Sequence, residues 1–129
     1  LGTDEIRNYQ QAGLVAYLDD DHFLRLSHVA IWNTRQTEFG KEMPFADGTS
    51  YGGMAIGTPA PVTWLRLSHR IDPANGEHEF RAASSRDGRH WTWGGVWTLP
   101  AGTQPRIGLI SHGGAGAVAE FDYLRIYQP

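Results

Sequence analysis

The alternation of apolar and polar side chains in residues 63–71 is the feature that most constrains how this chain folds. Leu65 and Leu67 fall on one side of an extended backbone, and Trp64 and Arg66 fall on the other. An amphipathic helix needs apolar residues at intervals of three and four, and no window of about eleven or more residues has that period. The sequence therefore predicts strands and essentially no long helix.

Turn sequences divide the chain into a series of short strands. Residues 11–18 and 22–28 are expected to form a hairpin around the acidic turn Asp19–Asp21, and residues 63–71 and 77–84 a second one. Asp87 and Gly88 predict a third hairpin with a type I′ turn. Further strands are expected at residues 29–39, 51–56, 96–99, 106–110 and 117–127, with a loop at 40–50. Strands at this spacing are typical of a sandwich or barrel.

Length and composition restrict the class of protein. The 129 residues suit one domain, 1–129, and the absence of an initiating Met leads us to expect a fragment of a longer chain. A net charge of −3 argues against a nucleic-acid partner. The chain has no cysteine, which excludes disulfides and thiolate metal sites. No apolar run approaches the roughly 18 to 20 residues that span a bilayer, so we expect a soluble protein without a membrane partner.

Five segments, in order over nearly the whole chain, resemble a known family. They are residues 9–17 (YQQAGLVAY), 64–67 (WLRL), 85–91 (SRDGRHW), 107–109 (IGL) and 121–126 (FDYLRI). This pattern is similar to the concanavalin-like C-terminal β-sandwich of family 43 β-xylosidases and arabinofuranosidases, and to related domains of unknown function. The resemblance implies a concanavalin A-like jelly-roll sandwich of two antiparallel sheets, secreted to the extracellular space with polysaccharide-degrading enzymes.

The chain departs from that family at its beginning. In the family, the strand that matches residues 9–17 lies well inside the domain, after further strands that this chain lacks. The sheet is therefore expected to be incomplete, with an open edge whose unpaired backbone groups are available to another chain. We expect residues 1–8 to lie beside a second polypeptide. The partner would be a catalytic glycosidase domain or a missing N-terminal segment.

Aromatic and arginine side chains give the positive signal for carbohydrate binding. Sugar rings present flat C–H faces that stack on Trp and Tyr, and arginine donates hydrogen bonds to their hydroxyl groups. Strand parity places one such set opposite the aliphatic residues, and it is the predicted carbohydrate-binding platform if the strands are neighbours: Tyr17, Arg25, Trp64, Arg66 and Arg81. The alternative is that a second layer covers this face and Trp64 belongs to the core.

Catalysis would need two carboxylates facing each other across the sugar. Glu120 and Asp122 are expected on one face of the last strand, as in the Glu-x-Asp-x-x-Glu strand of concanavalin-like glucanases. The third acidic position of that pattern is Arg125, so the proton donor is missing. The favoured interpretation is that Asp122 is structural, and no catalytic residue is assigned.

Metal and nucleotide sites are not indicated. The six histidines show neither a helical i, i+4 pair nor a His-x-His pair, so no zinc site is predicted. The run Asp19–Asp21 offers oxygen ligands for calcium, but a solvated hairpin tip is the preferred interpretation. The glycines of residues 113–116 lack the lysine and helix of a phosphate-binding loop.

The sequence is thus interpreted as a noncatalytic carbohydrate-binding or accessory module of a secreted glycoside hydrolase that acts on xylan or arabinan. One alternative is a concanavalin A-like glycosidase that uses Glu120 and Asp122. The other is a structural or assembly β-sandwich without a ligand.

Overall fold

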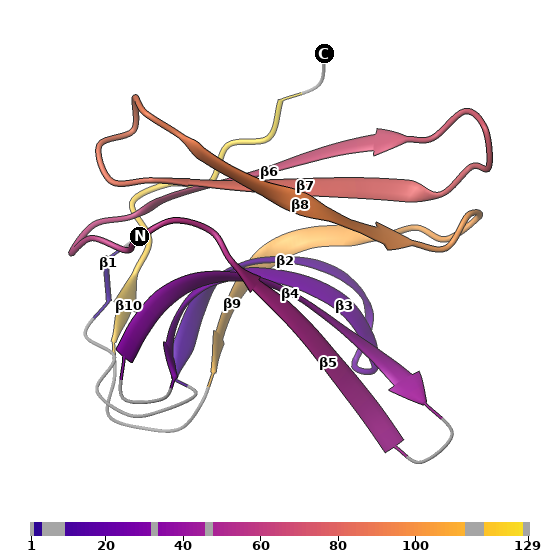
Figure 1. Cartoon of the computed structure of the whole chain (residues 1–129), viewed down its shortest axis with the longest axis horizontal. Coiled ribbons are helices and arrows are strands. Elements are labelled where there is room, and N and C mark those ends of the chain that lie inside the picture. Colours follow the sequence, from indigo (N-terminus) through magenta and orange to yellow (C-terminus); the bar gives the residue numbers. More distant parts are fainter. Residues whose placement is uncertain (1, 4–9, 32–33, 46–47, 113–117, 128–129) are drawn as a thin grey trace.

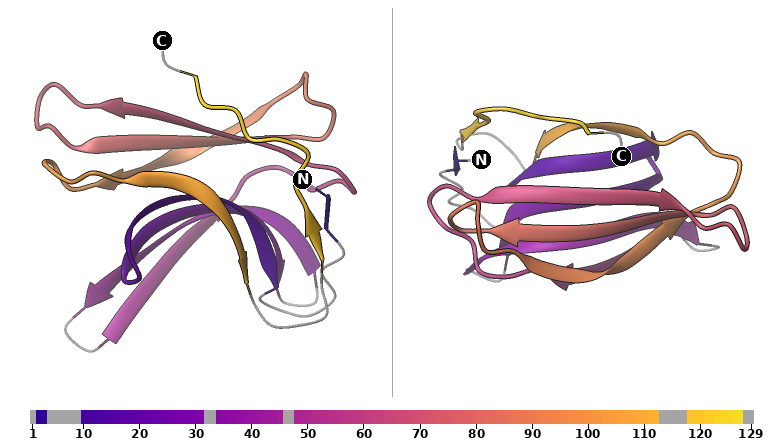
Figure 2. Two further views of the ribbon diagram at one scale, coloured as in Figure 1. Left: turned by 180° about the vertical axis from the view of Figure 1, so that it is seen from behind. Right: turned by 90° about the horizontal axis from the view of Figure 1, so that it is seen from above.

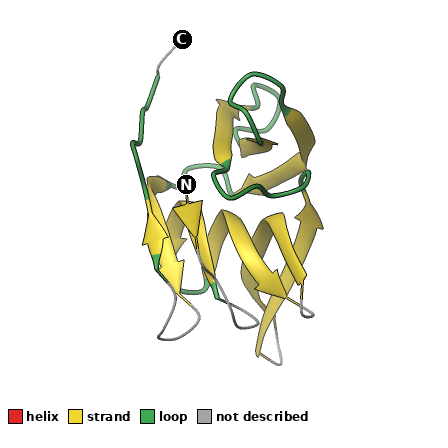
Figure 3. Cartoon of the chain, turned by 90° about the vertical axis from the view of Figure 1, so that its left-hand side faces the viewer, coloured by secondary structure: helices red, strands yellow, loops and turns green. Residues whose placement is uncertain are grey.

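The computed structural model describes residues 2–3, 10–31, 34–45, 48–112 and 118–127. Within these ranges the chain is all-β, and its strands form the two packed antiparallel sheets expected from the sequence (Figures 1 and 3). Among the described residues no helix has the length and apolar character needed to cross a membrane.

The larger sheet of the described chain has five antiparallel strands. They are β2 (Gln11–Asp19), β3 (His22–Ile31), β4 (Thr34–Phe45), β5 (Gly48–Ala55) and β9 (Arg106–His112), in the order β5-β4-β3-β2-β9. The first four follow one another as a meander, and the predicted hairpin of β2 and β3 is confirmed. After β5 the chain crosses to the second sheet and then returns as β9, beside β2.

The smaller sheet of the described chain has three antiparallel strands. They are β6 (Trp64–Ile71), β7 (His78–Ser85) and β8 (Thr92–Leu99), in that order. Two further short strands, β1 (Gly2–Thr3) and β10 (Ala119–Glu120), pair with each other apart from both sheets. Residues 1 and 4–8 lie outside the described residues, so the second polypeptide expected beside them stays a prediction.

The core lies between the two sheets. Leu24 and Leu26 of β3 and Phe39 of β4 are fully buried and meet Phe80 and Leu99 from the smaller sheet. The neighbours of these residues along each strand point the opposite way, because successive side chains of a strand alternate between its faces. Each sheet therefore has an inner, apolar face and an outer face.

The five-stranded sheet is strongly curved. Figures 1 and 2 show it as an arch whose convex side faces β6, β7 and β8 and whose concave side is turned away from them. The residues between the core positions of β2, β3, β4 and β5 therefore point into the concave side.

The predicted loop at residues 40–50 is wrong. β4 continues through this segment to Phe45, and β5 begins at Gly48. The expected single strand at residues 29–39 is likewise divided, because β3 ends at Ile31 and β4 begins at Thr34. Trp32, whose side of the sheet the sequence did not assign, lies outside the described residues.

The predicted strand at residues 117–127 is also largely wrong. Within residues 118–127, the part of it that the structure describes, only Ala119 and Glu120 form a strand, and residues 121–127 continue without regular structure. The glycines of residues 113–116 lie outside the described residues. A strand requires a partner as well as a suitable sequence, and residues 121–127 pair with no described strand.

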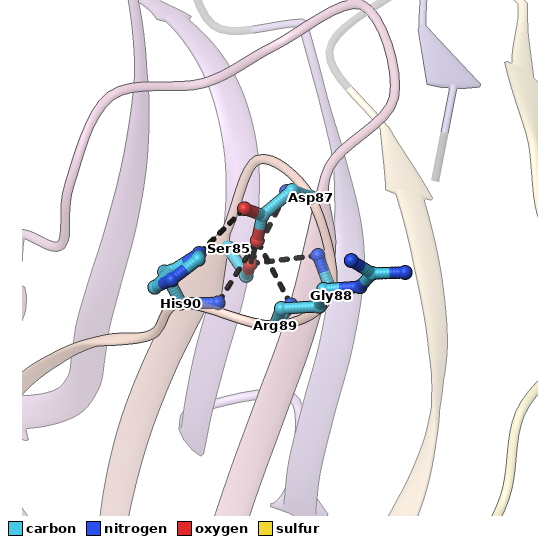
Figure 4. A network of polar contacts seen from close by, with 5 residues as sticks. All are labelled: Ser85, Asp87, Gly88, Arg89 and His90. Carbon is cyan, nitrogen blue, oxygen red and sulfur yellow. Dashed lines mark hydrogen bonds and ion pairs between the residues drawn. The ribbon is translucent and has the colours of Figure 1, made fainter.

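The turn around Asp87 and Gly88 joins β7 to β8 as predicted, but it is longer than a two-residue type I′ turn. β7 ends at Ser85 and β8 begins at Thr92. The Ser85 hydroxyl oxygen accepts hydrogen bonds from the Asp87 and Gly88 amides at 3.2 and 2.8 Å. One Asp87 carboxylate oxygen accepts from the amides of Arg89 and His90 at 2.8 and 2.9 Å (Figure 4).

The Asp87 carboxylate of this turn also contacts the His90 ring, with 2.7 Å between an Asp87 oxygen and Nδ1. The backbone and ring hydrogen bonds from His90 hold the pKa of Asp87 far below its usual value. The same contact raises the pKa of His90. Side-chain hydrogen bonds of this kind fix a turn that lacks regular backbone pairing.

Gly88 has a φ of 75°, so we expect Gly88→Val to destabilise the protein by about 1–3 kcal/mol. The added Cβ would also lie 3.1 Å from the Trp64 indole. The matched control is Gly102→Val, because Gly102 has a φ of 76° and open space around its Cβ position. Urea unfolding should show Gly88→Val as the more destabilising of the two. An unchanged unfolding midpoint for Gly88→Val would show that the turn is wrongly placed.

Candidate functional site

The five residues predicted to bind carbohydrate do not form one platform. All lie on outer faces, as parity requires, but Tyr17 and Arg25 belong to the five-stranded sheet. Trp64, Arg66 and Arg81 belong to the three-stranded sheet. The core separates the two outer faces, so the condition that these strands be neighbours is not met. Pairing between strands is long-range information, which alternation within a strand does not contain.

The outer face of the three-stranded sheet carries arginines stacked on tryptophans. The Arg66 guanidinium lies 4.0 Å from the Trp91 ring centre, and that of Arg81 lies 5.0 Å from the Trp93 ring centre. Ala83 pairs with Arg66 on one side and Trp93 on the other, and it is fully buried although it points outward. The chain's own side chains therefore cover the middle of this face.

The concave face of the five-stranded sheet carries a more extensive set of polar side chains. We call this set the polar row, and every strand of the sheet contributes to it: Gln11, Arg25, Ser27, Gln36, Glu38, Tyr51 and His112. Of these, only Arg25 was predicted from the sequence. The alternation of Gln36, Glu38 and Gly40 with buried Thr37 and Phe39 is the sequence signal that would have extended the site into β4.

Tyr51 lies across the sheet because its neighbours are glycines. Its hydroxyl donates to a carboxylate oxygen of Glu38, and Gln36 Nε2 donates to the other carboxylate oxygen at 2.7 Å. A Cβ on Gly40 would collide with the Tyr51 hydroxyl, and a Cβ on Gly53 would lie 3.0 Å from the Glu38 carboxylate. Gly40 and Gly53 face each other in the β4–β5 pairing. Together they leave the space that the tyrosine ring occupies.

Arg25 is the buried cation of the polar row. Only 9% of the residue is exposed, and its guanidinium lies 4.7 Å from the Tyr51 ring centre. Nη1 donates to His112 Nε2 at 3.1 Å, while Nη2 is 3.9 Å from a Glu38 oxygen. Among the described residues, Nε has no hydrogen-bond partner. Burial lowers the pKa of Arg25, and the negative charges of Glu38 and Glu42 oppose that shift.

His112 is held in one tautomer by Arg25. An arginine can only donate, so His112 Nε2 must accept and the ring proton must be on Nδ1. Burial lowers the pKa of His112, and the nearby Arg25 charge lowers it further. The neutral ring therefore accepts one hydrogen bond from Arg25, and a protonated ring would break that bond.

The other histidines and the acidic turn have local roles. His78 Nε2 donates to the Thr103 carbonyl at 2.8 Å, so its Nδ1 accepts from His69 Nε2 at 2.8 Å. At the β2–β3 tip, Asp19 accepts from the Asp21 amide at 2.9 Å and contacts the His22 ring. A search of the described residues found no group of three or more His, Asp or Glu side chains that could hold a metal ion.

The carboxylate pair proposed for catalysis is not on one strand face. Glu120 is the last residue of β10, and Asp122 lies beyond the end of that strand. Both residues are exposed. The alternation that would have aligned the two carboxylates ends with the strand, so the expected geometry is absent.

These features define the class of the protein as a two-sheet antiparallel β-sandwich with a polar row on its concave face. A scan against models of protein families, a search of curated proteins and a search of solved structures gave no significant match.

The lowered pKa of His112 predicts a pH effect on stability. Between its folded pKa and about 6.5, the unfolded chain binds the proton and the folded chain does not. The stabilisation from neutral His112 is thus complete above the pKa of the ring in the unfolded chain. It is lost as the pH falls through the pKa of the ring in the folded chain. We expect the urea unfolding midpoint to be lower at pH 5 than at pH 7.5, and His112→Gln, which keeps an acceptor for Arg25, to reduce this difference.

Part of the difference should remain in that variant, because burial also lowers the pKa of His28 and His69. His90→Gln is the control with the opposite sign. Because the pKa of His90 is raised in the folded chain, His90 stabilises the protein below the pKa of the unfolded chain, and this stabilisation is lost as the pH rises. Replacing His90 should therefore enlarge the decrease in unfolding midpoint between pH 7.5 and pH 5. An unchanged difference in His112→Gln would contradict the assigned role of the ring.

Proposed function

We propose that the chain is a noncatalytic carbohydrate-binding or accessory module of a secreted glycoside hydrolase. Its ligand is a xylan- or arabinan-type chain that lies across the concave face of the five-stranded sheet. The resemblance of its ordered segments to the sandwich domains of family 43 enzymes supports the class of ligand. The polar row supports the position of the site.

The exposed and fixed ring of Tyr51 is the observation that carries this proposal. It is 42% exposed, yet its hydroxyl is held by Glu38 and its position is set by Gly40. Strand pairing aligns Tyr51 with Glu42, Phe23 and Tyr17 in one cross-strand line. Aromatic rings in fixed orientations offer stacking surfaces to sugar rings at little cost in conformational entropy.

Polar groups for hydroxyl recognition lie beside this aromatic line. The adjacent cross-strand line has little side-chain volume apart from the long side chain of Arg25. Its other members are Gly108, Val15, Gly40 and Gly53. Beyond it are the carboxylate of Glu38 and the amide of Gln36. Sugar-binding sites typically combine such rings with a few precisely placed polar groups.

The spacing of the carboxylates on this face favours binding over hydrolysis. Glu38 and Glu42 share the concave face of β4 but lie four residues apart, which is about 13 Å along a strand. Glycoside hydrolysis needs two carboxyl groups separated by about 5 to 9.5 Å. In addition, both oxygens of Glu38 accept hydrogen bonds from within the chain.

Calorimetric titration with xylo- and arabino-oligosaccharides tests the proposal. Tyr51→Ala should weaken binding by about five- to tenfold, since stacking on one ring contributes on the order of 1–1.5 kcal/mol. Trp93→Ala is the matched control, because Trp93 is 40% exposed on the outer face of the other sheet. Loss of binding in Trp93→Ala but not in Tyr51→Ala would move the site to that face. No binding by the native chain would favour the structural or assembly sandwich.

Gly40→Ala tests whether the position of the Tyr51 ring is needed for binding, because this variant moves the ring without removing it. The added methyl group displaces the Tyr51 hydroxyl, so oligosaccharide affinity should fall at least fivefold while the ring remains. Gly108→Ala is the control in the same cross-strand line, because its Cβ would make an ordinary 3.8 Å contact with Val15. Equal affinities of the two variants would show that the ring need not lie across Gly40.

A reducing-sugar assay distinguishes the proposed module from the glycosidase alternative. The isolated chain should release no sugar from xylan or arabinan. Hydrolysis that disappears in Glu120→Ala would establish the enzyme and overturn the noncatalytic assignment.

A further inference from the structure

The inner face of β9 is incompletely covered. Leu109 pairs with Leu14 and Ile107 pairs with the fully buried Ala16, so both point toward the sandwich interior. Nevertheless Ile107 is 40% exposed and Leu109 is 45% exposed. β6 packs against β2 and β3, and β8 packs against β4 and β5. The three-stranded sheet is thus too narrow to cover the fifth strand of its neighbour.

The uncovered residues lie beside the free edge of β6. β6 pairs with β7 on one side and with no described strand on the other. Its inward-facing Leu65 and Leu67 are only half-buried, although they pack against the core. A free edge of unpaired backbone groups next to an apolar floor is the arrangement to which an extended peptide adds as a further strand.

The chain's own last segment does not fill this place. Residues 121–127 run on the β6 side of the three-stranded sheet, as the view from above in Figure 2 shows, but they form no strand. Tyr123, Ile126 and Tyr127 are largely exposed there. The described part of the chain therefore supplies no fourth strand.

We propose that the free edge of β6, above Ile107 and Leu109, is the binding site for an extended polypeptide strand of another chain, in which apolar residues alternate with acidic ones. The apolar residues cover the floor and the acidic ones point outward.

Charge complementarity sets the acidic positions of this strand. Arg70 at the edge pairs with Glu79 at 2.6 Å, whereas the exposed Arg66 stacks on Trp91 and has no carboxylate partner among the described residues. A carboxylate on the outward side of an added strand would neutralise Arg66. Opposite charges on neighbouring strands are favourable, and like charges are unfavourable.

The same argument disfavours a second copy of this chain as the partner. If Leu124 and Ile126 of its last segment covered the floor, Arg125 would point outward beside Arg66. In the other register, Arg125 would point into the apolar floor. Neither register combines an acidic outward side with an apolar inward side, because Asp122 points outward only when Arg125 points inward.

Binding of synthetic nine-residue peptides tests this inference. A peptide of alternating valine and glutamate should bind, and it should slow hydrogen exchange of β6 amides. Peptides with lysine in place of glutamate, or with the same residues in two blocks, should bind at least tenfold more weakly. Arg66→Glu should reverse the preference between the glutamate and lysine peptides.

Leu109→Glu should weaken binding of the valine–glutamate peptide at least tenfold, and Val96→Glu is its control at an exposed position of β8. Circular dichroism checks that both variants fold. Equal binding of all peptides, or none, overturns the inference. Concentration-dependent dimerisation that Leu109→Glu abolishes also overturns it, in favour of a second copy. The polar row lies on the opposite face of the sheet, so oligosaccharide binding is measured independently.

Discussion

Alternation along β3 and β4 sends neighbouring residues into two different environments, and both the core and the candidate site depend on it. Leu24, Leu26 and Phe39 point inward, and the residues beside them, Arg25 and Glu38, point into the concave side. A slip of one residue in the pairing would exchange the two sets and place charges in the core. The burial of the aliphatic side chains, which stabilises the fold, therefore also fixes the position of the polar row.

The concave face gains its order from tight packing around glycine. Gly40 and Gly53 allow the Tyr51 ring to lie flat, so that its hydroxyl reaches Glu38 and its face supports the Arg25 guanidinium. His112 then accepts from Arg25. A site whose side chains are already fixed loses little conformational entropy when a ligand binds. Such rigidity suits a module that holds a polysaccharide.

The two outer faces of the sandwich differ in what they offer to a ligand. On the three-stranded sheet, Arg66 and Arg81 stack on tryptophans of their own chain and enclose Ala83. On the five-stranded sheet, Tyr51 keeps a large exposed area beside donors and acceptors. The inner face of β9 is a third surface, and its exposed leucine and isoleucine suit a polypeptide strand rather than a sugar.

The sequence predicted the strand class, the hairpins and the outward direction of all five proposed site residues, because these are local properties. It did not predict that Arg25 and Trp64 belong to different sheets, since strand neighbours are set by distant residues. The part of β4 after Phe39 was predicted as a loop because Lys41 and Glu42 are polar. Polar residues are nevertheless compatible with a strand, since one face of an antiparallel sheet can be polar. Residues 121–127 were predicted as a strand from their alternation, yet they pair with no described strand.

Backbone amide chemical shifts recorded during titration with a xylo- or arabino-oligosaccharide test the central claim most directly. We expect the shifts to change along β3, β4 and β5 around Arg25, Glu38 and Tyr51, with those of β6, β7 and β8 unaffected. Changes confined to the three-stranded sheet, or no changes at saturating sugar, would contradict a saccharide site on the concave face.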